Sequence, residues 1–214
     1  NISHTGTFVL PNEGVRINAQ GMKVIEGKEY AESRAKTLMT NFADFEMLEH
    51  VGHGGGGVVN KALHVPTKET VAVKRINVLD ADKRHQLVRE LKTLWKASSQ
   101  YIVDFKGAFF DEDHLYVVLE YMDGGSLQDV LRKTGKLPEK IIGQMTRSIV
   151  HGLAYLKQLK MVHRDIKPGN ILVSRQGQVK LTDFGVTGDL SAAAAEASTF
   201  VGTAKYMSPE QLRG

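Results

Sequence analysis

Two short segments, His163–Asn170 and Asp183–Gly185, restrict the possible folds of this chain more than any other part of it. The first holds a carboxylate at Asp165, a cation at Lys167 and an amide at Asn170, and the second holds a further carboxylate on a turn. Such groups can align an attacking hydroxyl, neutralise a phosphoryl group and bind Mg²⁺ through hard oxygen ligands. The fold must therefore bring two loops together, in a site suited to ATP and two magnesium ions.

The residues around these loops predict the elements that carry them. Pro138 suits the start of a helix. One apolar stripe, which is predicted to be buried, follows it at spacings of three and four residues, through Ile142, Met145, Ile149, Leu153 and Leu156. Ile171–Val173 and Val179–Leu181 predict a short hairpin on either side of a glycine turn. This hairpin ends next to Asp183 and is expected to deliver it to the loop of Asp165.

The first half of the chain alternates short apolar runs with turn residues. Residues 1–40 predict a small hairpin or an extended arm. Residues 45–78 predict a twisted antiparallel sheet, which further strands near Val103–Phe109 and Leu115–Glu120 continue. Asp80–Trp95 predicts a helix with an apolar face of Leu87, Leu91 and Leu94. The pattern is that of an α+β fold.

A glycine-rich turn interrupts the predicted sheet. Glycine lets the backbone approach phosphate oxygens closely and donate its N–H groups. A dinucleotide-binding turn would open a helix, whereas Val58–Ala62 predicts a returning strand, and a plain hairpin bend is the other alternative. The predicted phosphate-binding residues are Val51, Gly52, His53, Gly54, Gly55, Gly56, Gly57, Val58 and Val59. His53 is expected to face solvent.

Lys74 follows three small or β-branched residues and is expected to point from a strand toward the glycine-rich turn, where it would hold phosphates. The ordinary alternative is a solvated lysine at the end of a strand, since lysine is mostly exposed. Glu90 favours the first interpretation, because a carboxylate beside the apolar face of its helix needs a partner. A Lys74–Glu90 pair would make the orientation of Lys74 depend on the position of that helix.

Composition excludes several classes of protein. The 214 residues are 42% hydrophobic and 24% charged and contain no cysteine, so a disulfide framework and a thiolate zinc site are both impossible. No apolar run reaches membrane-spanning length, and the first residues lack a signal-peptide pattern. The net charge of +4 is spread among both signs rather than gathered in a stripe. We therefore expect no nucleic-acid partner, no membrane partner and a cytoplasmic location.

In this order the motifs resemble those of the eukaryotic protein kinases, from about Phe45 to Gly214. The resemblance implies a protein kinase-like fold, with an N-terminal arm or hairpin at 1–40, an antiparallel-sheet N-lobe at 41–120, and a hinge with the first, mainly helical part of the C-lobe at 121–214. It implies a catalytic set of Asp165, Lys167, Lys74 and Glu90, and magnesium ligands at Asn170 and Asp183. Adenine would be bound by Val59, Ala72, Leu119, Glu120 and Met122.

More narrowly, the chain is similar to the MAP kinase kinases. Lys167, two residues after Asp165, is typical of Ser/Thr-directed and dual-specificity kinases. Met122–Leu127, Thr199–Thr203 and Tyr206–Glu210 also match that family, and the leading arm is similar to plant and protist members. The resemblance implies a dual-specificity enzyme of an intracellular signalling cascade. Its substrate would be the Thr and Tyr of a MAP kinase activation loop, and its activator a MAP kinase kinase kinase.

Two alternatives stay open. The chain could be another Ser/Thr kinase of the same cascades, which would not place phosphate on both Thr and Tyr. It could also be a nucleotide-binding pseudokinase scaffold, although degenerate kinases usually lack an equivalent of Lys74, Asp165 or Asp183, and all three are present here.

The segment before Tyr206 departs from the family pattern. Thr199 matches one of the two regulatory phosphorylation sites, and Ser198 is a neighbouring candidate. The other site falls on Ala193 or Ala195, neither of which can carry phosphate. We therefore expect a low-activity state, whether these alanines are natural or introduced. The chain also stops at Gly214, before the remaining C-lobe helices of the family, so a longer enzyme with additional cover for the helix after Pro138 is expected.

Overall fold

The computed structural model describes residues 8–10, 15–18, 21–24, 41–54, 57–77, 91, 94–95, 97–111, 114–183 and 204–213. The chain divides into two compact units. Unit 1 comprises Asn1–Ala97 and Asp104–Tyr121, and unit 2 comprises Ser98–Val103 and Met122–Gly214. The predicted α+β class is confirmed, with an antiparallel sheet in unit 1 and helices in unit 2.

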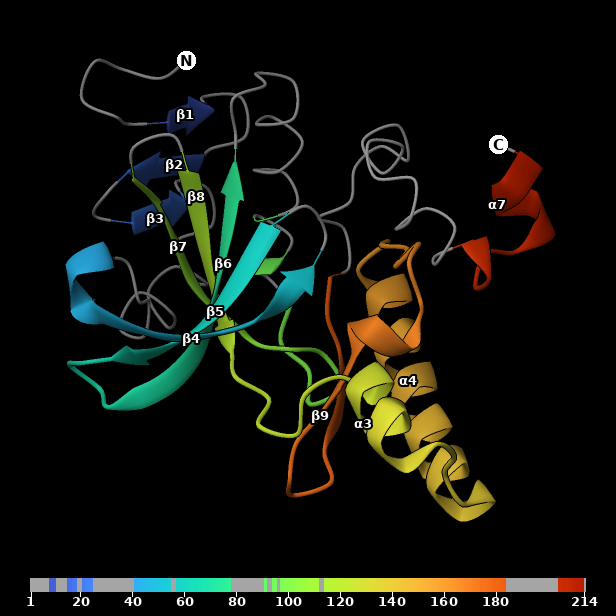
Figure 1. Cartoon of the computed structure of the whole chain (residues 1–214). Helices are drawn as coiled ribbons and strands as arrows, with labels where there is room; N and C mark the ends of the chain where they lie inside the picture. Colours follow the sequence, from blue (N-terminus) through green and yellow to red (C-terminus); the bar gives the residue numbers. More distant parts are fainter. Residues whose placement is uncertain are drawn as a thin grey trace. The chain divides into compact units, whose positions relative to one another are not determined.

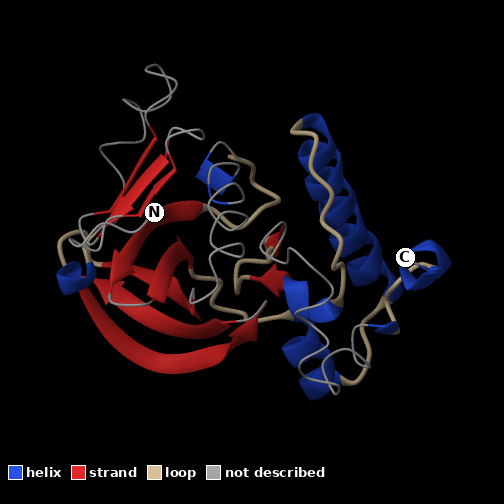
Figure 2. Ribbon diagram, turned by 90° about the horizontal axis from the view of Figure 1, so that it is seen from above, coloured by secondary structure: helices blue, strands red, loops and turns tan. Residues whose placement is uncertain are grey.

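Unit 1 is built on a five-stranded antiparallel sheet in the order β4-β5-β6-β8-β7 (Figure 1). Its strands are β4 (Phe45–Gly54), β5 (Gly57–His64), β6 (Glu69–Asn77), β7 (Phe105–Asp111) and β8 (His114–Glu120). The predicted sheet is confirmed, although β7 starts two residues later than its sequence pattern indicates. The ribbons of this sheet are visibly twisted and curved in Figure 2, as expected for L-residues in adjacent strands.

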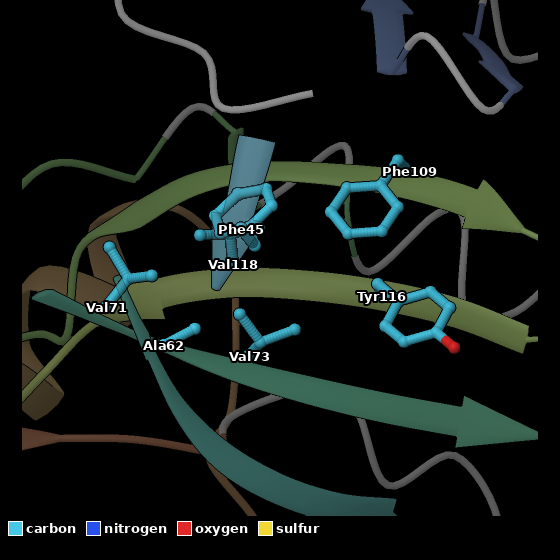
Figure 3. Packing of buried hydrophobic residues seen from close by; sticks show 7 residues of the cluster. All are labelled: Phe45, Ala62, Val71, Val73, Phe109, Tyr116 and Val118. Carbon is cyan, nitrogen blue, oxygen red and sulfur yellow. The ribbon is translucent and has the colours of Figure 1, made fainter. Parts of the chain in front are cut away.

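One face of this sheet carries a cluster of buried apolar side chains. The alternation along β6 buries Val71 and Val73 on this face. Figure 3 shows that they gather with other buried side chains, and the whole cluster is Phe45, Ala62, Val71, Val73, Phe109, Tyr116 and Val118. The rings of Phe109 and Tyr116 stack with centroids 5.0 Å apart. The other face carries the intervening residues of the same strands, Lys74 and the buried Val117 among them.

Residues before the sheet form a separate three-stranded antiparallel sheet of β1 (Phe8–Leu10), β2 (Val15–Asn18) and β3 (Gly21–Val24). The predicted hairpin is thus extended by one strand. Ile17 is almost completely buried, and β2 and β3 lie near β7, which is an edge strand of the larger sheet. A short 3₁₀ helix, η2 (Phe42–Asp44), then leads into β4.

The predicted helix at 80–95 is described only at three positions near its end. Leu91, Leu94 and Trp95 are helical and buried, which agrees with the apolar face expected there. Leu87 and Glu90 lie outside the described residues.

Unit 2 contains the helices α3 (Leu127–Thr134) and α4 (Glu139–Gln158). Ser126 and Asp129 form a capping box at the start of α3, a motif in which losing the cap residue typically costs about 1 kcal/mol. Pro138 stands at the N-cap position of α4, so the predicted helix start is confirmed. The short helices η3 (Pro168–Asn170) and α7 (Pro209–Arg213) complete the helical elements among the described residues.

The predicted apolar stripe of α4 is only partly buried. Met145 and Leu156 are buried, but half of the Ile142 surface is exposed, so the expectation for Ile142 is wrong. The reason is that α4 contacts β10 (Val179–Leu181), and this contact is made near Gly152, nearly three turns after Ile142. No helix among the described residues is long and apolar enough to cross a membrane.

The predicted hairpin is confirmed. Strand β9 (Ile171–Val173) pairs with β10 antiparallel, with Ile171 opposite Leu181. Figure 1 shows β9 beside α3, and the two elements are in contact. The hairpin ends at Thr182 and Asp183. It therefore brings the predicted loop of Asp183 to the end of the loop His163–Asn170.

Candidate active site

The glycine-rich turn joins two strands, as predicted, rather than a strand and a helix. Strand β4 ends at Gly54, and Gly54 pairs with Gly57 at the start of β5; Gly55 and Gly56 lie outside the described residues. A Cβ on Gly57 would lie 2.5 Å from the Arg75 carbonyl oxygen, so packing of β5 on β6 requires glycine there. A Cβ on Gly52 would meet nothing within 4 Å. The open space at Gly52 leaves room for a ligand close to the backbone.

The strand register places several predicted ligand-binding residues on one face of the sheet. Val59 pairs with Gly52 on one side and with Lys74 on the other, and Ala72 pairs with Leu119. Because directly paired residues project to the same face, the residues of this face include Gly52, Val59, Ala72, Lys74 and Leu119. It is the face opposite to Val71 and Val73. His53 pairs with Val58, so both side chains lie on that opposite face, and His53 is exposed as expected.

Lys74 lies in the interior of β6, between β5 and β8, and only 2% of its surface is exposed. The alternative of a solvated lysine at a strand end is therefore wrong. Burial of an ammonium group requires compensating charges or hydrogen bonds, which is why a buried lysine marks a candidate site. Its predicted partner Glu90 lies outside the described residues, so the Lys74–Glu90 pair stays a prediction.

Residues 119–122 carry the chain from unit 1 into unit 2. Glu120 is fixed twice to Asp104: its backbone N–H donates to the Asp104 carbonyl oxygen at 2.9 Å, and its Oε2 accepts from the Asp104 N–H at 3.1 Å. The Lys61 ammonium lies 5.4 Å from the centroid of the Tyr121 ring and 2.9 Å from Glu49 Oε1. Sequence reasoning missed these contacts, since no local pattern pairs residues so far apart in the chain.

In unit 2 the loop after α4 brings Asp165, Lys167 and Asn170 together. Lys167 Nζ lies 2.8 Å from Asp165 Oδ2, and Asn170 Nδ2 donates to the same oxygen at 2.7 Å and to the Asp165 carbonyl oxygen at 2.8 Å. Asp165 Oδ1 is buried and has no hydrogen-bond partner in the described part of the chain. One carboxylate oxygen is thus held by two cationic or amide donors, and the other is left for a ligand.

The hairpin places Asp183 next to Asn170. The Thr182 N–H donates to the Asn170 carbonyl oxygen at 3.1 Å, immediately before Asp183. Both Asp183 and Arg164 adopt left-handed backbone conformations, with φ of 59° and 68°. Such conformations of non-glycine residues cost on the order of 1–3 kcal/mol and often occur at functional sites. Because Asn170 uses Nδ2 for both bonds to Asp165, its Oδ1 remains as an oxygen ligand for a cation shared with Asp183.

Magnesium fits this donor set. It usually takes one or two protein oxygens together with water and phosphate, whereas zinc prefers several nitrogen or sulfur ligands. Among the described residues, no group of three or more His, Cys, Asp or Glu side chains could hold a metal ion.

His163 is packed inside unit 2, as expected for a structural histidine. Burial lowers its pKa below the ordinary 6.5, and this effect outweighs the backbone hydrogen bond and the carboxylates of Asp165 and Asp183, which act in the opposite direction. The imidazole is therefore neutral near pH 7. Its Nδ1 accepts the Asp165 N–H at 3.4 Å, which helps to fix the backbone of the Asp165 loop.

Gly152 is a supporting residue that sequence reasoning missed. Leu181 exchanges backbone hydrogen bonds with the segment before β7: its N–H donates to the Tyr101 carbonyl oxygen, and its own carbonyl oxygen accepts the Val103 N–H, both at 2.9 Å. A Cβ on Gly152 would lie 2.9 Å from Leu181 Cδ1 and 3.1 Å from the Tyr101 oxygen. Glycine thus lets α4 lie close to the strand that leads to Asp183. The available signal was a glycine inside a helix, where it is intrinsically unfavourable.

The structure thus collects the predicted residues in two sets, one on each unit. Unit 1 holds the face of Lys74, and unit 2 holds Asp165, Lys167, Asn170 and Asp183. Thr199 and Ser198, the predicted regulatory positions, lie outside the described residues.

A family model described as the protein kinase domain matches residues 45–214, which is well over half of the chain. The match begins at the first residue of β4 and includes both sets of site residues. The chain belongs to the protein kinase domain family.

Proposed function

We propose that this protein is a dual-specificity MAP kinase kinase, which transfers phosphate from ATP to the Thr and Tyr of a MAP kinase activation loop. Membership of the protein kinase domain family supports a phosphotransferase that acts on protein. The finer assignment is supported by Lys167 two residues after Asp165 and by the family-like segments Met122–Leu127 and Thr199–Thr203.

The observation that carries the catalytic proposal is the Asp165 carboxylate. Its Oδ2 is held by Lys167 and Asn170, while its buried Oδ1 has no partner among the described residues. In our proposal Oδ1 accepts the hydrogen bond of the attacking substrate hydroxyl. It takes up the proton as the new O–P bond forms, while the bond between the γ-phosphorus and the bridging oxygen breaks and ADP leaves. Catalysis then depends mainly on alignment, as phosphoryl transfer generally does.

The other residues of the proposed site would bind ATP and neutralise the negative charge of its phosphates. Lys167 would neutralise the transferred phosphoryl group, and Lys74 would hold the α- and β-phosphates. Asn170 Oδ1 and Asp183 would hold magnesium, which when bound neutralises phosphate charge and orients the phosphates. The backbone around Gly52 would approach the phosphates, with Val59, Ala72 and Leu119 against the adenine, and residues 120–122 pairing with its edge.

The proposed partners are a MAP kinase as substrate and a MAP kinase kinase kinase as activator, in the cytoplasm. Another Ser/Thr kinase of the same cascades is the alternative enzyme. A pseudokinase scaffold is disfavoured because Lys74, Asp165 and Asp183 are all present and Asp165 is held in an ordered geometry.

The test uses the protein with Mg-ATP and a panel of catalytically inactive MAP kinases, followed by mass spectrometry of their activation loops. Phosphate on both Thr and Tyr of one panel member is the expected result, and an Asp165→Asn variant should leave that substrate unmodified. Transfer to serine or threonine of other proteins alone would replace the proposal with the general Ser/Thr kinase. ATP binding without any transfer, even after treatment with an upstream kinase, would favour the scaffold.

A further inference from the structure

Two exposed histidines lie against each other on β4, just before the glycine-rich turn. The rings of His50 and His53 meet edge to face, with centroids 4.7 Å apart and an angle of 64° between their planes. This contact is unexpected in a regular strand, where residues three apart point to opposite faces of the sheet. Something in the backbone must bring the two imidazoles to the same side.

A β-bulge provides the explanation. His50 pairs with Asn60 and His53 pairs with Val58, so three steps along β4 correspond to only two steps along β5. The register shifts between His50 and Gly52, where one extra residue is inserted into β4. Both histidines therefore face the same side of the hairpin, the side of Asn60 and Val58 and opposite to that of Val59 and Lys74.

Asn60 orients one of the two rings. His50 Nδ1 lies 3.4 Å from Asn60 Oδ1. In the tautomer that carries hydrogen on Nδ1, His50 donates to this oxygen, and the lone pair of Nε2 is then directed away from Asn60. A histidine that ligates a metal is commonly fixed in this way, by a hydrogen bond from its other ring nitrogen to an oxygen.

We propose that His50 and His53 bind one divalent transition-metal ion of the zinc and copper class on the face of the glycine-rich hairpin that is opposite to Lys74. Two imidazole nitrogens at roughly 2.0–2.1 Å from a tetrahedral ion place the ring centroids about 5 Å apart. The observed separation is 4.7 Å, so the two rings lie at the spacing that a shared ion requires. Imidazole favours zinc, copper and nickel over magnesium.

The site has two protein ligands, and water completes the coordination. No cluster of three or more His, Cys, Asp or Glu side chains is present in the described ranges, so a third such ligand is not supplied there. The bound ion would tie the two sides of the bulge together and stiffen the hairpin from the face opposite to Lys74. It is thereby distinct from the magnesium proposed at Asn170 and Asp183, and it does not depend on the proposed kinase activity.

The experiment titrates the tag-free protein with ZnCl₂ and follows the imidazole nitrogens by long-range ¹⁵N–¹H NMR, with calorimetry for affinity and stoichiometry. The signals of His50 and His53 should shift together as one equivalent is added, with Mg²⁺ in excess present throughout. Either single variant, His50→Gln or His53→Gln, should weaken binding at least about tenfold, because it removes one of two ligands. Asn60→Ala should weaken it by roughly tenfold through loss of the orienting hydrogen bond.

The matched control is His151→Gln, since His151 is exposed, lies on α4 in unit 2 and stacks on Tyr101 at 5.0 Å. This variant should bind zinc with unchanged affinity. Equal affinity in the His50 and His53 variants, or zinc shifts confined to other histidines, would overturn the proposal. The spectra of the unmodified protein decide this point even if a variant fails to fold.

Discussion

At the scale of single residues, the most consequential arrangement is the asymmetric environment of the Asp165 carboxylate. One oxygen has two donors within 2.8 Å, and the other is buried without a partner among the described residues. A buried acceptor without a donor is unfavourable, which is why we propose that a ligand hydroxyl completes it.

Asp165→Asn should therefore lower kcat for peptide phosphorylation by about 10²- to 10⁴-fold, the range typical for loss of a general base. The amide is close in shape to the carboxylate, so the thermal unfolding midpoint should stay close to that of the unmodified protein. Glu139→Gln, an exposed change in the first turn of α4, is the matched control and should retain full activity. Near-normal kcat in Asp165→Asn would remove this residue from the reaction.

His163 predicts a dependence of stability on pH. Its pKa is lowered in the folded protein, chiefly by burial, so the unfolded chain binds a proton more readily than the folded one. This stability is present above the ordinary value of 6.5 and is lost as the pH falls through the lower, folded-state pKa. The urea concentration at the unfolding midpoint should accordingly decrease as the pH is lowered from 7.5 to 5.5. The variant His163→Asn should show a smaller decrease. The exposed His151→Gln should leave the decline as it is; if it flattens the curve equally, burial of His163 is not the cause.

At the scale of elements, the site of unit 2 depends on how closely α4 approaches β10. The hairpin β9–β10 carries Asp183 at its end, and the N–H of Thr182 ties that end to Asn170. The hydrogen bonds of Leu181 to Tyr101 and Val103 hold the other side of β10. The helix can lie against this strand only because position 152 lacks a side chain.

The two glycines of α4 make opposite predictions. Gly152→Val should destabilise the protein by about 1–3 kcal/mol, since its side chain would overlap Leu181 and the Tyr101 carbonyl oxygen. A Cβ on Gly143 would meet nothing within 4 Å. Gly143→Ala should therefore stabilise the protein by up to about 1 kcal/mol, because alanine is the better helix former. Urea unfolding of both variants measures the difference. A neutral Gly152→Val would show that the close approach of α4 is not required.

At the scale of the whole molecule, the proposed site residues lie on two units of different construction. Unit 1 uses a sheet face, where strand register aligns Gly52, Val59 and Lys74. Unit 2 uses loops at the ends of a helix and a hairpin. Regulation is expected to act through residues between these loops and α7.

Phosphorylation at Thr199 should raise activity. A phosphate there would form charge-assisted hydrogen bonds with a cation such as Arg164, and one such bond of about 1.5 kcal/mol corresponds to roughly a tenfold shift in favour of the active state. Treatment with an upstream kinase should thus increase kcat at least about tenfold, with phosphate located by mass spectrometry. Thr199→Ala should lose this response, and Ser198→Ala should keep it. Full activity in protein without phosphate at either residue would contradict the expectation.

Most of the fold could be predicted because the patterns involved are local. Alternating residues identified the strands, the positions of glycine identified the turns, and Pro138 with spacings of three and four identified α4. The burial of Ile142 was predicted wrongly because periodicity shows which face of a helix is apolar, but not how far along the helix another element covers it.

The sequence by itself determined the chemical types at the site: a carboxylate at Asp165 with a lysine two residues later, an amide at Asn170, and a second carboxylate at Asp183. The first three lie within six residues, so their order alone specifies their neighbourhood, and the hairpin pattern of the following residues predicted the return of Asp183. Only the tertiary structure decided which groups meet across larger separations. It paired Lys74 with Val59 and buried it, left Asp165 Oδ1 without a partner in the described residues, and brought His50 beside His53 through a bulge. Register, bulges and burial depend on the partner strand, and no single segment contains that information.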